Sequence, residues 1–181
     1  MDFSWRFDRW FKGLPASPKD LGSVRRLVLR PPGEGTGARR VMPEIRVVAG
    51  KGVEGDRWFD EERELHENQV SLVNIHVLES LAGTDEERCA LSGDNLQVDL
   101  DLTEGNLPPG TLLHVGDAVL EVSATPHMPC IKFHQRYGVT AVKKVLRANK
   151  VGRRGRGMLC VVHTTGTIRA GDSIRVERIG D

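Results

Sequence analysis

Short apolar segments rich in β-branched residues recur along the chain from Gly22 onward, and turn residues separate them. The intervals between the segments are short and irregular. This spacing is typical of a largely antiparallel barrel or sandwich and not of a regular series of strands and crossover helices. We expect strands at 24–29, 45–48, 70–73, 112–115, 119–122, 158–162 and 174–176.

The first residues carry a different pattern. Phe3, Phe7, Trp10 and Phe11 recur at i, i+4, i+7 and i+8, and Pro15 ends the series. Because this spacing gathers side chains on one helical face, we expect a short amphipathic helix. Such a helix either caps the core of its own domain or docks on a partner, of which a second copy of the chain, forming a homodimer, is one form.

Two internal stretches also depart from the strand pattern. Asn74 is positioned to cap a helix, and apolar side chains follow it at helical spacing. The positions are Ile75, Leu78 and Leu81 in the first stretch and Val139, Val142, Val145 and Leu146 in the second. The sequence therefore predicts a mainly β protein, a barrel with a few peripheral α-helices, in which an N-terminal helix at 1–21 is appended to one domain at 22–181.

Composition narrows the function classes. With 181 residues, 39% of them hydrophobic, the chain can bury one substantial core. Its 26 Lys and Arg balance 25 Asp and Glu, so the chain has no large net charge that would attract nucleic acid or an anionic membrane at long range. An anionic ligand must therefore be bound by positively charged residues that lie close together. No apolar run approaches the roughly 20 residues of a membrane span.

The first residues and the cysteines indicate the compartment. The N-terminal stretch lacks the apolar run and cleavage site of a secretory signal. Three widely spaced cysteines suit a reducing compartment better than a disulfide framework, so the cytoplasm is the expected location.

Glycine-containing turns supply the first candidates for a binding site. The segment 33–38, GEGTGA, is not a dinucleotide loop, because prolines precede it and no helix pattern follows. In GVEGDRW (52–58), Asp56 could accept backbone N–H bonds, and Arg57 presents a planar fork suited to phosphate or carboxylate. In SGDN (92–95), Asp94 and Asn95 could bond local backbone or the edge of a heterocycle. An ordinary surface turn is the alternative for both segments.

Cys130 is the candidate for reactive chemistry. It lies in TPHMPCIKF, where Pro126 and Pro129 stiffen the backbone and hold the thiol in a defined place. A thiolate is both a nucleophile and a soft metal ligand, and three basic side chains nearby in sequence favour it electrostatically. These are His127, Lys132 and His134. A buried, inert cysteine is the alternative.

Two further patterns are less specific. Cys130 with His134, and Cys160 with His163, could be drawn as a zinc site, but the spacing lacks the two close ligand pairs of a zinc module. The loop VGRRGRG could close over an anionic ligand or be solvated. Its basic residues are Arg153, Arg154 and Arg156.

Taken in order, five segments resemble the landmarks of the MOSC family, proteins related to the C-terminal domain of molybdenum cofactor sulfurase. They are GVEGDRW, QVSLVN, LSGDNLQV, LLHVGDAVLEVSATPHMPC and RGMLCVVHTTGTIRAGDSIRV. The resemblance spans 22–176 and implies an antiparallel β-barrel with flanking helices. Trp58 stands where many relatives carry histidine, so no role is transferred to that position.

The resemblance also implies a ligand, the molybdenum cofactor, which is a pterin dithiolene carrying a phosphate. The cysteine matching Cys130 is the family's proposed metal ligand or sulfur carrier. Gly55, Asp56 and Arg57 would line the cofactor site, with Asp94 and Asn95 in a facing turn. The resemblance implies no role for Lys132, Arg153, Arg154 and Arg156, which are added as candidate cofactor-binding residues because of their positive charge.

Three functions follow as hypotheses. The first is reduction of N-hydroxylated compounds at a cofactor held by Cys130; a separate electron-transfer protein would be needed, because the sequence shows no flavin, haem or iron–sulfur motif. The second is a sulfur carrier in which Cys130 accepts a persulfide from a cysteine desulfurase. The third is a non-catalytic module that holds a small anion.

Overall fold

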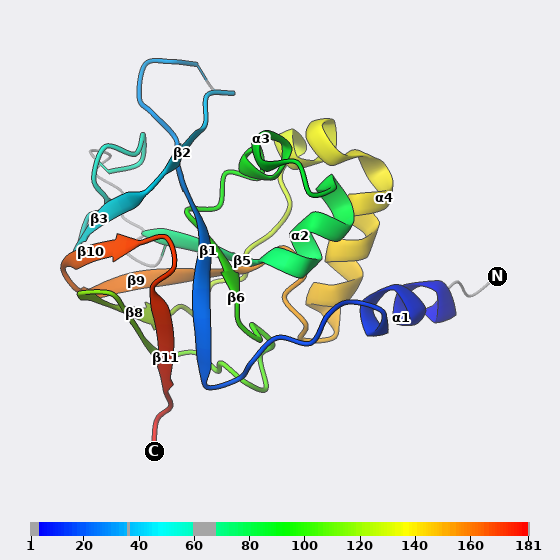
Figure 1. The fold of residues 1–181 in the computed structure, drawn as a ribbon. Coiled ribbons are helices and arrows are strands. Elements are labelled where there is room, and N and C mark those ends of the chain that lie inside the picture. The colour runs from blue at the N-terminus through cyan, green and yellow to red at the C-terminus, as the bar shows by residue number, and fades with distance from the viewer. Residues whose placement is uncertain (1–3, 36, 60–67, 181) are drawn as a thin grey trace.

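A computed structural model describes residues 4–35, 37–59 and 68–180. Within them, seven strands form a closed barrel, because hydrogen bonds between β11 and β1 join the two ends of the strand order (Figure 1). In spatial order these strands are β11 (Ser173–Glu177), β7 (Leu112–Val115), β8 (Ala118–Val122), β9 (Met158–Thr164), β5 (Val70–Asn74), β6 (Leu96–Asp99) and β1 (Leu21–Leu29). The mainly β barrel predicted from the sequence is confirmed.

One pair of barrel strands is parallel. β5 and β6 run in the same direction, and α2 (Ile75–Ala82) and α3 (Glu86–Ala90) connect them, whereas the other paired barrel strands are antiparallel. Asn74 ends β5 and caps α2, since its side chain accepts a hydrogen bond of 3.0 Å from Val77 N. The predicted cap is confirmed.

Four short strands extend this framework. β2 (Arg40–Met42) pairs with the end of β1, while β10 (Gly166–Arg169), β3 (Glu44–Val48) and β4 (Gly52–Val53) form a small separate sheet. β4 is followed at once by the turn that carries Asp56 and Arg57. The small sheet therefore presents one of the two predicted binding turns.

The barrel interior is the main core. Alternate residues of strands such as β7, β8 and β11 are buried, as a strand with one face inside requires. A smaller apolar cluster packs α2 and α4 (Ile131–Lys150) against β5, through residues that include Val73, Leu78, Phe133 and Val145. The helices thus lie on one side of the barrel (Figure 1).

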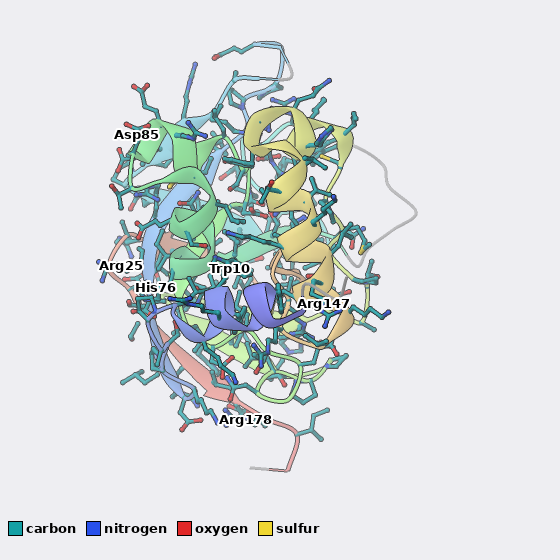
Figure 2. All side chains as sticks on the ribbon, turned by 90° about the vertical axis from the view of Figure 1, so that its right-hand side faces the viewer. Trp10, Arg25, His76, Asp85, Arg147 and Arg178 are labelled. Atoms are coloured by element: carbon teal, nitrogen blue, oxygen red, sulfur yellow. The ribbon has the colours of Figure 1, made fainter. Side chains whose placement is uncertain are left out.

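The N-terminal helix α1 (Ser4–Lys12) packs against its own domain. Trp10 Nε1 donates a 3.1 Å hydrogen bond to Ser80 Oγ of α2, and the guanidinium carbon of Arg153 lies 4.5 Å from the centroid of the Phe11 ring. Figure 2 shows α1 crossing in front of α2 and α4, with Trp10 and Arg147 labelled. Phe3 and Thr36, which belong to predicted segments, lie outside the described residues.

Among the described residues, every helix is too short or too polar to span a lipid bilayer.

Candidate functional site

A cavity of about 480 Å³ brings together distant parts of the chain, and its volume is typical of a small-molecule site. The end of β1, the turn after β4, the turn before β6 and the start of α4 all contribute to it. Its lining consists of Arg30, Arg39, Arg57, Trp58, Asn68, Ser71, Ser92, Gly93, Asp94, Asn95, His127, Met128, Cys130, Lys132, Arg136, Arg156 and Leu159.

Positive charge dominates this lining. Among the described residues it includes five arginines and one lysine against one carboxylate, that of Asp94. A cavity of similar volume, about 470 Å³, lies between the segment after α1 and the barrel, but no cysteine is among its described lining residues. The cationic cavity is therefore the candidate site.

Cys130 lies at the start of α4 and is exposed. It occupies the N-cap position, and its side chain makes no capping hydrogen bond, so local structure does not engage the sulfur atom. The other two cysteines are buried, and burial raises the pKa of Cys160 to about 12. Of the three cysteines, all of which the structure describes, Cys130 is the one with an exposed thiol, and it lines the cationic cavity.

Asp56 organises the turn after β4. Its carboxylate accepts hydrogen bonds from Arg30 N at 3.1 Å, Arg30 Nε at 2.8 Å and Trp58 N at 3.1 Å. The side chain is almost fully buried, and its charge is compensated by Arg30 and by these donors. As expected from the sequence, Asp56 fixes the loop by accepting backbone N–H bonds.

Asn95 links this turn to the barrel. Its Nδ2 donates to Asp56 Oδ2 at 3.2 Å, and its Oδ1 accepts from Ser71 N at 3.2 Å and Arg30 Nη2 at 3.1 Å. The residue is fully buried. The two glycine-containing turns found in the sequence are therefore joined directly, through the amide of Asn95.

Asp94 and Arg156 form a second buried pair. Arg156 Nη1 lies 2.7 Å from both carboxylate oxygens of Asp94, and the guanidinium carbon lies 4.8 Å from the Phe133 ring centroid. His127 Nδ1 lies 3.6 Å from Asp94 Oδ1. Burial, and after it the positive charge of Arg156, lowers the pKa of His127 to about 3. His127 is neutral at neutral pH, so the prediction that its charge would favour a Cys130 thiolate is wrong.

Three of the lining arginines were not identified from the sequence: Arg30, Arg39 and Arg136. Burial, and after it the positive charges of Arg136, Arg57 and Arg30, lowers the pKa of Arg39 to about 10. Arg39 follows the rejected dinucleotide-loop segment at 33–38, and the other two belong to no motif. Only the fold brings their charges together.

The sequence-predicted residues divide into three groups. Arg57, Asp94, Asn95, Cys130, Lys132 and Arg156 line the cavity. Gly55 and Asp56 lie in the adjoining turn without lining it. Arg153 lies against Phe11, and Arg154 Nη1 donates to Leu107 O at 2.9 Å, so these two side chains lie away from the cavity.

The zinc arrangement has no structural support among the described residues, which contain no cluster of three metal-ligating side chains. Cys160 is fully buried in β9, and His163 Nδ1 lies 3.8 Å from Glu121 Oε2 instead. The two cysteine–histidine pairs do not converge on one point.

Fold and site together define a class: a small β-barrel protein with an exposed thiol beside a cationic cavity. The family model described as the MOSC domain matches residues 48–175, and the chain belongs to this family.

Solved structures of bacterial proteins share the fold. YuaD from Bacillus subtilis is 20% identical, with a TM-score of 0.62, over 86% of this chain and 95% of that one. YiiM from Escherichia coli is 21% identical, with a TM-score of 0.55, over 87% and 72%. YiiM from Geobacillus stearothermophilus is 17% identical, with a TM-score of 0.57, over 88% and 76%. No curated protein matches the chain.

Proposed function

We propose that the protein binds the molybdenum cofactor and reduces N-hydroxylated compounds with electrons from a separate protein. The observation that best supports this function is the placement of Cys130, an exposed thiol on the lining of a cavity rich in guanidinium groups. Membership of the MOSC family agrees with a molybdenum cofactor as ligand. The sulfur carrier remains the second candidate.

The residues of the cavity fit this cofactor. Cys130 supplies the soft sulfur ligand that molybdenum accepts, and Arg57 and Lys132 supply charge-assisted donors for a phosphate. Within the described residues, Nε of Arg57 and Nε of Arg156 are buried without a hydrogen-bond partner, which is costly unless a ligand completes their bonding. When bound, the cofactor would supply a metal that changes oxidation state by two electrons.

Each turnover would break one N–O bond. Two electrons and two protons enter, and an amine and one molecule of water leave. The cations of the cavity would hold the anionic ligand, and the pair of Asp94 and Arg156 would keep one wall fixed. Neutral His127 can donate one N–H bond and accept another, so it could bind a substrate hydroxyl without adding charge.

The exposed thiol also favours the second candidate, a sulfur carrier. In that reaction the Cys130 thiolate attacks the outer sulfur of a desulfurase persulfide, a new S–S bond forms at Cys130, and the desulfurase leaves with its thiolate restored. This function requires the exposed thiol but not the phosphate partners. The anion-binding module is the remaining alternative and predicts ligand-dependent stabilisation without turnover.

The test compares Cys130→Ala and Cys130→Ser with the control Gln135→Ala, an exposed residue of α4 that does not line the cavity. Protein is produced in a host that makes the cofactor, and molybdenum content and reduction of an N-hydroxylated base by dithionite-reduced methyl viologen are measured. We expect loss of molybdenum and turnover in both Cys130 variants and not in the control. Normal turnover in Cys130→Ala would refute the reductase.

Mass spectrometry separates the two candidates. If wild-type protein holds no molybdenum but gains one sulfur atom at Cys130 after incubation with a cysteine desulfurase and cysteine, the sulfur carrier is supported. If it neither holds molybdenum nor gains sulfur, yet inorganic phosphate raises its melting temperature, the anion-binding module is supported.

A further inference from the structure

The helix that begins beside Cys130 has an unusual charge. The chain as a whole is balanced, with 26 basic and 25 acidic residues, but α4 contains no Asp or Glu in its 20 residues. Its basic residues are Lys132, Arg136, Lys143, Lys144, Arg147 and Lys150. α4 therefore carries a concentration of positive charge that the overall composition does not reveal.

Part of this helix presents an ordered surface to solvent. After the non-helical residue Gly138, four exposed residues follow at i, i+4, i+7 and i+11, which places them on one face. They are Val139, Lys143, Leu146 and Lys150, and we call this surface the α4 outer face. Val139 is 54% exposed and Leu146 is 38% exposed, so aliphatic and cationic groups alternate along it.

Two more exposed apolar residues flank the thiol. Met128 is 53% exposed and Ile131 is 68% exposed, on either side of Cys130 in the sequence. Val139, where the α4 outer face begins, is nine residues beyond Cys130; seven helical steps of about 1.5 Å and two steps of at most about 3.8 Å at Gly138 place it within about 20 Å of Cys130. A standard interface covers about 800 Å² on each partner, a patch about 30 Å across. An interface of this size centred on the α4 outer face is wide enough to reach the residues around the thiol.

We propose that the α4 outer face, with Met128 and Ile131, is the docking site for an acidic electron-carrier protein. This inference rests on the proposed reductase function, because only that reaction needs electrons from outside. A carrier that transfers one electron at a time would have to dock twice per turnover, and one carrier molecule would be oxidised at each docking. Complementary charge would steer the encounter, and the aliphatic side chains would form the desolvated centre of the contact.

Other occupants fit the surface less well. A second copy of the chain would bring one α4 outer face against another across a two-fold axis, so that two positively charged faces would meet without a carboxylate from either α4 to offset the repulsion. The alternative that this surface contacts only water does not explain its four apolar side chains, which are 38–68% exposed. An anionic membrane shares the charge preference of an acidic protein, and it is therefore an explicit outcome of the test.

The experiment uses reduced plant-type [2Fe–2S] ferredoxin, an acidic carrier, and dithionite-reduced methyl viologen, which needs no docking site. The test variant is Lys143→Glu/Lys150→Glu, and Val139→Asp is a second variant that changes only the apolar part. The matched control is Arg25→Glu/Arg175→Glu, which changes net charge equally at exposed strand positions of β1 and β11. Figure 2 shows Arg25 far across the molecule from α4. The dissociation constant for oxidised ferredoxin is measured on each protein, with or without cofactor.

We expect the double reversal to weaken ferredoxin binding and ferredoxin-driven turnover at least about tenfold, with viologen-driven turnover unchanged. In the control both should change less than about twofold, and raising salt should weaken wild-type binding. Equal ferredoxin binding by test and control variants would overturn the docking site. So would binding of wild type to phosphatidylserine vesicles, lost in the double variant, without any effect on ferredoxin. Absence of viologen-driven turnover in the wild type would instead remove the reductase function itself.

Discussion

Arg156 Nη1 lies 2.7 Å from each carboxylate oxygen of Asp94, and both side chains are buried. Asp94 belongs to the turn before β6, whereas Arg156 precedes β9, so the pair ties two loops together at the cavity wall. A buried charge without its partner is expensive, and the pair is therefore a strong constraint on both loops.

Asp94→Ala should lower the free energy of unfolding by about 3–5 kcal/mol, because it leaves the Arg156 guanidinium buried without a counter-charge. In the double variant Asp94→Ala/Arg156→Met, no charged group is left buried without its partner. The decrease in the free energy of unfolding should therefore be at least about 1 kcal/mol smaller than in Asp94→Ala. Urea denaturation at pH 7 measures both variants. A double variant that is less stable than the single one would contradict this account.

The neutral state of His127 predicts a pH dependence of stability. Burial and Arg156 lower the pKa in the folded protein from 6.5 to about 3, so between these values the unfolded chain binds a proton that the folded protein does not. The stabilisation is complete above pH 6.5 and is lost as pH falls. Between pH 7 and pH 5, wild type should lose about 2 kcal/mol more than His127→Asn. Denaturant titrations at both pH values measure this loss of stability. The control is His134→Asn, which removes an exposed histidine. Equal losses in all three proteins would contradict the prediction.

Much of the barrel could be predicted because its strands are short, β-branched and separated by turn residues. β6 escaped prediction because it contains Gln97, a polar residue that is fully buried. The amide of Gln97 donates to Cys89 O at 3.0 Å and accepts from Arg26 Nη1, so its burial costs little. Because Arg26 is distant from Gln97 in the sequence, the local sequence pattern did not indicate that Gln97 would be buried in a strand.

The candidate site was predicted in part for a related reason. The turns at 52–58 and 92–95 and the thiol of Cys130 carry local signatures of glycine, proline and charge. Arg30 and Arg136 carry none, since each is an isolated cation whose role depends on which strands become neighbours. Arg153 and Arg154 were selected as members of a basic run, but their side chains serve α1 and a backbone carbonyl.

Arg57 lines the cavity and Arg153 does not, so their substitutions should have different effects. Arg57→Ala should reduce molybdenum content several-fold, because it removes a guanidinium from the cavity lining. Arg153→Ala should leave the content unchanged and instead loosen α1, since the guanidinium lies on the Phe11 ring. Elemental analysis and the rate of proteolysis near residue 12 measure the two effects. Equal molybdenum loss in both variants would contradict the assignment of the cofactor to the cavity alone, because Arg153 lies away from the cavity.

Gly157 allows the chain to pass close to β5 immediately before β9 begins. Its φ of +94° is in the left-handed region, and a Cβ atom there would lie 2.0 Å from Leu72 O. Gly83, the C-cap of α2, has a similar φ of +81°, but no atom lies within 4 Å of its would-be Cβ. Gly83→Ala therefore measures backbone strain alone, about 1–3 kcal/mol. Gly157→Ala causes the same kind of backbone strain and also requires β5 to move. It should therefore be at least about 2 kcal/mol more destabilising than Gly83→Ala. Urea denaturation of the two variants tests this difference, and equal losses would show that β5 yields to the extra methyl group without cost.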